Sequence, residues 1–240
     1  MDVVGDLLAR DRRSRDVALV TADGRERTYH DLITNAYKAA NVLRYLGARE
    51  GSTVAVDPHP GFHTTIAFLG AARLGAAVRF DTSAGIEAGD RVVLAPNEAE
   101  AELIPDPGTN LTVFGDPPDR PGTTHWESEL WSENPATPPS DVDPDDTVIR
   151  GENRVVSHRA LLALATRVAD DYEIDEGTRV VLRESFAVPN AVTAGVVAPL
   201  SRDATIVLDR SSKHGNGDVG VVRDADQYVP EPRHVTLATL

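Results

Sequence analysis

The chain has 240 residues, with 41% hydrophobic and 26% charged residues, which is the range of a folded globular protein rather than a disordered one. It contains no cysteine, which excludes disulfides and thiolate chemistry, and no apolar run approaches the ~20 residues that cross a bilayer. The N-terminal residues mix acidic and basic side chains, unlike a signal peptide, so we expect a cytoplasmic protein. The net charge of −14 argues against nucleic acid or an anionic membrane as its partner.

The charged residues have an unusual composition. Lys38 and Lys213 are the only lysines, so arginine supplies almost all of the positive charge, and the acidic residues are spread along the whole chain. Short carboxylates hold water and cations well, whereas the long apolar stem of lysine presents poorly hydrated surface. This composition resembles that of halophilic proteins, in which high salt screens the repulsion between carboxylates.

Helices and strands alternate in the first half of the chain. Thr28 and Asp31 form a capping-box pattern, apolar residues follow at helical spacing, and Gly47 stands where a helix-ending glycine belongs. A second helix is predicted from Pro60 to Gly75. Strands are predicted at 53–56, 76–80, 91–94 and 111–114. This alternation is typical of βαβ units with a mostly parallel sheet.

Residues 116–145 interrupt the alternation with many prolines and both tryptophans, which predicts a long connection with one short helical turn near 125–131. Beyond it, helices are predicted at 157–171 and 189–197, and strands at 147–149, 154–156, 178–182, 204–208 and 219–222. The predicted fold class is α/β, with two stacked lobes and mostly parallel sheets. Residues 1–115 would form the first lobe, 116–145 a proline-rich connection and 146–240 the second lobe.

One segment has the form of a phosphate-binding turn. Arg150, Gly151, Glu152 and Asn153 join two short β-branched runs, and Ser157 stands at the N-cap position of the next predicted helix. A strand, a tight glycine turn and a helix N-terminus can direct several N–H groups at a phosphate. This turn, however, offers one glycine, one acidic side chain and no lysine.

Four acidic residues have the spacing of a calcium-binding loop. Asp141, Asp143, Asp145 and Glu152 fall at positions one, three, five and twelve of an EF-hand. The glycine that position six requires is Asp146 here, so a solvated acidic loop is the better interpretation. A calcium-binding structural protein is kept as an alternative, although we expect no metal site.

Gly215, Gly217 and Gly220 match the GxGxxG pattern of dinucleotide-binding loops. Such a loop must follow a strand directly and open a helix, whereas Val221 and Val222 continue this one as a predicted strand. We therefore expect a glycine loop here and no cofactor.

Several short motifs follow one another in a recognisable order. They are the helix start RTYHDL, Gly47 and Gly51 before a strand, Gly75-Ala76 before the next, and APLSRDATIVL further on. In this order they resemble the opening of the ANL adenylate-forming superfamily, which contains acyl-CoA synthetases, adenylation domains and luciferases. The resemblance covers about residues 15–210, roughly the first half of a full-length member. Ser52 replaces the family's aspartate, and Asp203 replaces its glycine.

This resemblance implies an ATP-dependent acid–thiol ligase, in which a Ser/Thr/Gly-rich loop ending in Pro-Lys-Gly wraps the ATP phosphates. Residues 150–153 replace that loop, and the histidine that gates the acyl pocket in many members falls near Val188. The family's adenine-binding loop, magnesium-binding glutamate and C-terminal lysine domain would lie beyond residue 240. We therefore expect a catalytically degenerate, ligase-like protein that acts as a binding or regulatory module and catalyses no adenylation on its own.

An enzyme is the main alternative: the chain would be one half of a split acyl or aryl acid–CoA ligase, completed by another chain. Either way, the predicted strands at 178–182, 204–208 and 219–222 are apolar and need cover at their edge. A closing strand from residues 234–237 could supply it, but we expect a homodimer or a partner protein.

Overall fold

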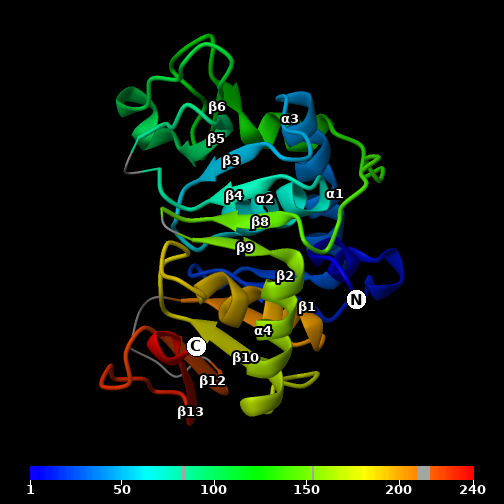
Figure 1. The fold of residues 1–240 in the computed structure, drawn as a ribbon, viewed down its shortest axis with the longest axis vertical. Coiled ribbons are helices and arrows are strands. Elements are labelled where there is room, and N and C mark those ends of the chain that lie inside the picture. The colour runs from blue at the N-terminus through cyan, green and yellow to red at the C-terminus, as the bar shows by residue number, and fades with distance from the viewer. Residues whose placement is uncertain (83–84, 153, 210–216) are drawn as a thin grey trace. The chain divides into compact units, whose positions relative to one another are not determined.

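The computed structural model describes residues 1–82, 85–152, 154–209 and 217–240 (Figure 1). The chain is an α/β protein with two sheets whose strands are mostly parallel, as predicted. Each sheet lies within one of two compact units. Unit 1 contains Met1–Ile33, His59–Phe62 and Arg159–Leu240, and unit 2 contains Thr34–Pro58 and His63–His158.

These units differ from the linear division that was expected at residues 115 and 145. The N-terminal segment joins the last part of the chain in unit 1, because β1 (Val17–Val20) pairs in parallel with β11 (Thr205–Leu208). The connection at 116–145 belongs to unit 2. Alternating apolar patterns predict that strands exist, but they do not say which strands pair over a long separation in sequence.

The sheet of unit 2 has the strand order β7-β6-β5-β3-β4-β8-β9. Its strands are β3 (Thr53–Val56), β4 (Ala77–Arg79), β5 (Asp90–Pro96), β6 (Asn110–Phe114), β7 (Thr124–His125), β8 (Thr147–Arg150) and β9 (Val155–Ser157). All neighbours pair in parallel except β8 and β9, which form an antiparallel hairpin. β3 and β4 are buried throughout, as expected of inner strands in a parallel sheet. The predicted strands are present, and β7 is an additional one.

The sheet of unit 1 has the strand order β13-β12-β10-β11-β1-β2. Its remaining strands are β2 (Glu26–Thr28), β10 (Arg179–Leu182), β12 (Val219–Val222) and β13 (Arg233–Thr236). Only β1 and β2 pair antiparallel. In Figure 1, α4 (His158–Asp171) lies over this sheet. β13 pairs with β12 at the edge, so a closing strand is present, and the homodimer stays a prediction.

The other main helices are α1 (Tyr29–Tyr45), α2 (Phe62–Arg73), α3 (Trp126–Ser132) and the short α5 (Ala198–Ser201), which continues a π-helical turn, η4 (Thr193–Val197). The predicted capping box at the start of α1 is confirmed. Asp31 N–H donates to Thr28 Oγ1, and Thr28 N–H donates to Asp31 Oδ2, each at 3.1 Å. Gly47 follows α1 in the left-handed region, with a φ of +98°.

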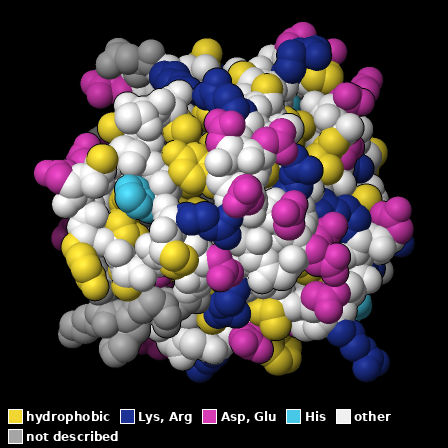
Figure 2. Space-filling model, turned by 90° about the horizontal axis from the view of Figure 1, so that it is seen from below, with side chains coloured by type: hydrophobic (Ala, Val, Ile, Leu, Met, Phe, Trp, Pro, Cys, Tyr) yellow, Lys and Arg dark blue, Asp and Glu magenta, His cyan; other side chains and the backbone are white. Residues whose placement is uncertain are grey.

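Within the described residues, no helix combines the length and the apolar character that crossing a membrane requires. On the face drawn in Figure 2, acidic side chains lie among basic and apolar ones rather than in one block. The spread of acidic residues along the sequence is thus also seen on this surface.

A buried carboxylate anchors the start of the proline-rich connection in unit 2. Glu100 is only 3% exposed, and its two carboxylate oxygens accept hydrogen bonds from the backbone N–H groups of Asp119 (2.8 Å) and Arg120 (3.2 Å). A hydrogen bond from the Thr123 side chain lowers the pKa of Glu100 most, burial opposes it, and the two backbone donors lower it further, to about 2.

The lowered pKa of Glu100 predicts that the free energy of unfolding decreases in acid. Since the pKa of Glu100 falls from its ordinary 4.5 to about 2 on folding, its contribution is present above pH 4.5 and is lost as the pH falls toward 2. Glu100→Gln should therefore be less stable than the native protein at neutral pH, with a difference that shrinks over this acidic range. Urea midpoints at a series of pH values measure it. Glu98→Gln, on the same turn but exposed, is the control, and a constant difference for Glu100→Gln would contradict the prediction.

Asp203, at the position of the glycine in the resembled family, adopts a left-handed conformation with a φ of +54°. Aspartate tolerates this region better than most residues. Its carboxylate Oδ1 lies 2.6 Å from Arg12 Nη2, which ties the turn after α5 to the N-terminal segment of unit 1. Asp203 thus has a positive φ, a conformation that glycine adopts without strain.

Asp203→Ala and Asp203→Gly should separate the effect of the backbone conformation on stability from the effect of the ion pair. Both variants remove the carboxylate, but only one of them is a glycine. We expect the alanine variant to be less stable than the glycine variant by about 1 kcal/mol, since only glycine adopts a positive φ without strain. Loss of the partly exposed ion pair with Arg12 should cost both variants about 1 kcal/mol or less. Equal stability of the two variants in chemical denaturation would show that the turn is unstrained.

Candidate ligand-binding site

The strand order of unit 1 creates a crevice at one sheet edge. From β10 the chain passes to its neighbour β11, and then crosses to β12 on the other side of β10. In open parallel sheets, ligands bind outside the carboxyl ends of the strands where the connections diverge in this way. The segments that follow β10, β12 and β13 therefore mark the expected place for a ligand.

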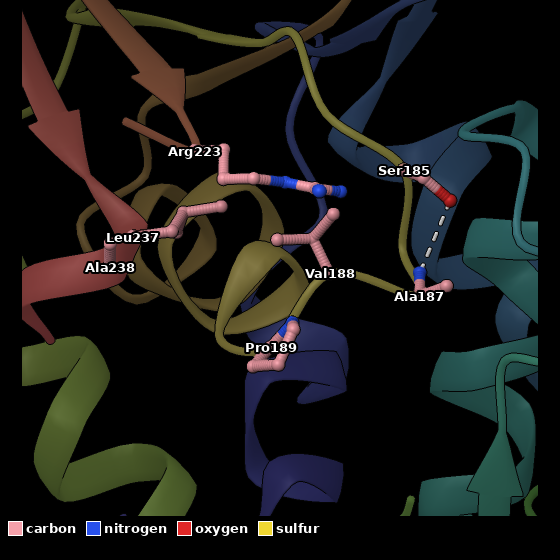
Figure 3. A pocket seen from close by; sticks show the side chains of 7 residues that line it. All are labelled: Ser185, Ala187, Val188, Pro189, Arg223, Leu237 and Ala238. Carbon is pink, nitrogen blue, oxygen red and sulfur yellow. Dashed lines mark hydrogen bonds between the residues drawn. The ribbon is translucent and has the colours of Figure 1, made fainter. Parts of the chain in front are cut away.

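A cavity of about 460 Å³ lies at this place (Figure 3). Its volume falls in the range of small-molecule sites. It is lined by residues that follow the three strands: Ser185, Ala187, Val188 and Pro189 after β10, Arg223 after β12, and Leu237 and Ala238 after β13. Its walls thus come from segments far apart in sequence.

The cavity has aliphatic walls and one cationic side chain. Val188 and Leu237 are buried. Arg223 extends its side chain toward Ser185 and Val188 (Figure 3). Ser185 Oγ accepts a hydrogen bond from Ala187 N–H at 3.2 Å. Apolar surface with a few polar groups is the usual composition of a ligand site.

A buried ion pair supports the segments that build the cavity. Arg183 directly follows β10, and Glu231 precedes β13. Their side chains are 1% and 0% exposed and meet through two contacts, Nε–Oε2 at 2.9 Å and Nη2–Oε1 at 2.5 Å. Such a bidentate pair fixes orientation as well as distance. Arg183 N–H also donates to the carbonyl oxygen of Val221 at 3.1 Å, which holds the end of β10 beside β12.

The structure places the predicted phosphate-loop residues in the hairpin of β8 and β9. Arg150 pairs with Val155, and Gly151 N–H donates to the carbonyl oxygen of Arg154 at 2.7 Å. Gly151 and Glu152 are exposed, and the half-buried Ser157 ends β9 directly before α4. Asn153 lies outside the described residues. The two predicted strands and the helix are therefore confirmed, and residues 151–154 separate the strands in the sequence.

In the loop of the calcium alternative, the carboxylates of Asp143 and its neighbour Asp146 accept hydrogen bonds from backbone N–H groups. Asp145 N–H donates to Asp143 Oδ1, and Asp143 N–H donates to Asp146 Oδ2, each at 2.8 Å. Across the described ranges, no group of three or more His, Asp or Glu side chains could hold a metal ion. The structure therefore does not assemble Asp141, Asp143, Asp145 and Glu152 into a ligand set.

The glycine pattern at 215–220 lies partly outside the described residues, which include neither Gly215 nor Asn216. Its second half enters β12 rather than a helix, as the sequence predicts. Val188, near which the gating histidine of the resembled family falls, lines the cavity. The sequence analysis missed Arg183, Arg223 and Glu231, although each arginine directly follows an apolar strand, and this position is a usable signal.

Comparison with known proteins gives a family match and several structural neighbours. The sequence profile described as "AMP-binding enzyme" matches residues 8–149. Among solved structures, apo MatB from Rhodopseudomonas palustris is 16% identical with a TM-score of 0.76, covering 92% of this chain and 48% of its own. A benzoate CoA ligase from Burkholderia xenovorans LB400 is 19% identical with a TM-score of 0.76, at 92% and 50% coverage.

The N-terminal domain of FACL13 from Mycobacterium tuberculosis is also 19% identical with a TM-score of 0.76, covering 92% of this chain and 63% of that domain. The chain thus spans about half the length of MatB and of the benzoate CoA ligase. At these identities the likeness concerns the fold. A search of curated proteins gives no match.

Proposed function

Because the chain belongs to the AMP-binding enzyme family, we propose that this acyl-CoA ligase-like domain binds a small ligand without carrying out adenylation. The observation that carries the proposal is the hairpin of β8 and β9, in which four residues, 151–154, stand in place of the long phosphate loop of the resembled family. Its main-chain groups at Gly151 and Arg154 are joined to each other by a hydrogen bond.

The charge of the hairpin supports the same proposal. Stabilising a triphosphate takes several converging N–H donors and a cation, as phosphate loops of nucleotide-binding proteins provide. Here the turn carries the exposed carboxylate of Glu152, which repels a phosphate, and Lys38 and Lys213 are the only lysines of the chain. Between residues 147 and 157, the basic side chains are those of Arg150, which ends β8, and Arg154, which precedes β9.

The cavity in unit 1 supports the proposal that the domain binds a small ligand. It is built from three segments and held by a buried ion pair, and Val188 occupies its wall at the position expected near the acyl pocket of the family. A domain that loses phosphate contacts can keep such a cavity, because the two depend on different residues. Fold and function separate readily in this way.

Pyrophosphate exchange tests whether the domain catalyses adenylation. With radiolabelled pyrophosphate, ATP, magnesium and a panel of aliphatic and aromatic acids, we expect no exchange above the protein-free blank. Exchange that any acid stimulates would contradict the proposal.

A tryptophan in the cavity tests the binding. Val188→Trp should fill much of the cavity, which holds about 460 Å³, and so abolish binding of small acids and amides while the domain stays folded. Ligand-observed NMR measures the binding, and circular dichroism checks the fold. Unchanged ligand binding by this variant would show that the cavity is not the site.

The alternative of a split ligase also lacks a phosphate loop in this chain. A second chain could supply an adenine site and a catalytic lysine, but this chain would still present the four-residue turn at 151–154. Pyrophosphate exchange that appears only after a second polypeptide is added would favour this alternative over the binding domain.

A further inference from the structure

A serine and a histidine meet in unit 2, where β7 leads into α3. His125 ends β7 and lies beside Val113 of β6, and Ser128 stands in the first turn of α3. Residues three positions apart lie on the same side of a helical turn, so the Ser128 hydroxyl reaches the His125 ring, with 2.8 Å between Oγ and Nδ1. Ser128 is exposed and the side chain of His125 is 21% exposed, so small molecules in solution can reach the pair.

The other contact of the His125 ring fixes which of its nitrogens carries the hydrogen. Nε2 lies 3.1 Å from the carbonyl oxygen of Gly115. A carbonyl oxygen can only accept, so Nε2 is the donor, and Nδ1 of the neutral ring has a lone pair that accepts the hydrogen of the Ser128 hydroxyl. A serine that donates to an unprotonated imidazole nitrogen is the pair of nucleophile and general base found in acyl-transfer sites.

Glu127 supplies a carboxylate beside the same ring. Its Oε2 lies 3.5 Å from His125 Nε2 and, within the described residues, is buried without a hydrogen-bond partner. Its Oε1 accepts a hydrogen bond from Gly115 N–H at 2.8 Å and lies 3.4 Å from His63 Nε2, so the carboxylate is held in place. The negative charge therefore lies where it offsets the positive charge that the ring gains when it takes a proton from the serine.

From this geometry we propose that Ser128 takes acyl groups from small activated esters, with His125 as the general base and Glu127 as a positioning residue. Ser128 Oγ attacks the ester carbonyl carbon while its hydrogen passes to His125 Nδ1. The alcohol leaves with that proton as its C–O bond breaks, and an acyl-serine remains. Attack by water, with the same proton transfers, releases the acid and restores the hydroxyl. Because Ser128 is exposed, we expect selection by the reactivity of the ester and little selection by the shape of the acyl group.

Two reagents test this proposal. Phenylmethanesulfonyl fluoride should label Ser128 of the native protein, as located by peptide mass spectrometry, and His125→Gln should slow this labelling at least about tenfold, since a general base contributes about 10²–10⁴ in rate. Ser128→Ala should slow the release of p-nitrophenolate from p-nitrophenyl acetate by a similar factor. Ser132→Ala is the matched control, because its hydroxyl, on the same helix, donates to the carbonyl oxygen of Glu129 at 3.0 Å.

Glu127 is tested through its charge. Glu127→Gln should slow the labelling of Ser128, and Glu127→Asp, which keeps the carboxylate, should restore part of the rate. Equal labelling in these two variants would show that the carboxylate has no role in positioning the base.

Two results overturn the proposal as a whole. One is a native protein in which Ser128 stays unlabelled, or is labelled no faster than after unfolding in urea. The other is equal labelling of Ser128 in His125→Gln and in the native protein, with circular dichroism verifying the fold of both. Ser128 and His125 belong to unit 2 and do not line the cavity of unit 1, so neither result bears on the proposed ligand binding.

Discussion

Replacing Arg183 by methionine is expected to lower the free energy of unfolding by about 3–5 kcal/mol, because it leaves the carboxylate of Glu231 buried without its partner. Both side chains of this pair are at most 1% exposed, so water cannot take the place of the guanidinium. A loss of this size is a large fraction of the ~5–15 kcal/mol by which a domain is stable. Chemical denaturation followed by circular dichroism measures it.

Two further variants test whether the buried charge causes this loss of stability. Arg183→Met combined with Glu231→Leu removes both charges, and we expect this double variant to be more stable than Arg183→Met alone, since buried pairs are often replaceable by apolar side chains. Arg202→Met disrupts the more exposed pair with Asp170 and should cost about 1 kcal/mol or less. The account of the buried pair is wrong if Arg183→Met costs no more than Arg202→Met.

Gly220→Ala is expected to destabilise the protein by about 1–3 kcal/mol, which is typical of overpacking in a core. Gly220 lies within β12, opposite His234 of β13. A Cβ atom at this position would collide with Val229 Cγ1 and would lie 2.8 Å from Glu231 Oε2. The added methyl group therefore pushes the carboxylate away from Arg183, so that overpacking and a weakened ion pair combine.

The matched control for Gly220→Ala is Gly122→Ala. Gly122 has no positive φ, and no atom outside its chain neighbours lies within 4 Å of the place that the added methyl group would take, so this substitution should change the stability by about 0.5 kcal/mol or less. Combining Gly220→Ala with Val229→Ala should recover part of the loss, because it removes one of the two collisions. Thermal and urea unfolding of the four proteins provide the comparison. A neutral Gly220→Ala would mean that the strand and its neighbours adjust without cost.

Local features of this fold were predictable from the sequence. The capping box of Thr28 and Asp31 and the helix-ending role of Gly47 depend on residues close in sequence, and both are confirmed. The hairpin of β8 and β9 was also predictable, because two β-branched runs flank a glycine turn. The α/β class followed from the alternation of these local signals.

Long-range features were not predictable in the same way. Leu19 of β1 pairs with Ile206 of β11, and no local pattern identifies this partner, so the division of the chain into units was missed. Arg183 and Glu231 are 48 residues apart, and nothing in the local sequence distinguishes either of them from an ordinary surface charge. The cavity was missed for the same reason, since its walls come from three segments that meet only at the sheet edge.

A calorimetric titration with ATP and magnesium tests the central claim most directly. The hairpin of β8 and β9 offers a four-residue turn with the acidic Glu152 where a phosphate loop would be needed. We therefore predict no saturable binding up to millimolar ATP, both in dilute buffer and in molar salt, while the folded state is verified in the same samples. A saturable isotherm with a dissociation constant in the micromolar range would contradict the claim that this domain has lost its nucleotide phosphate site.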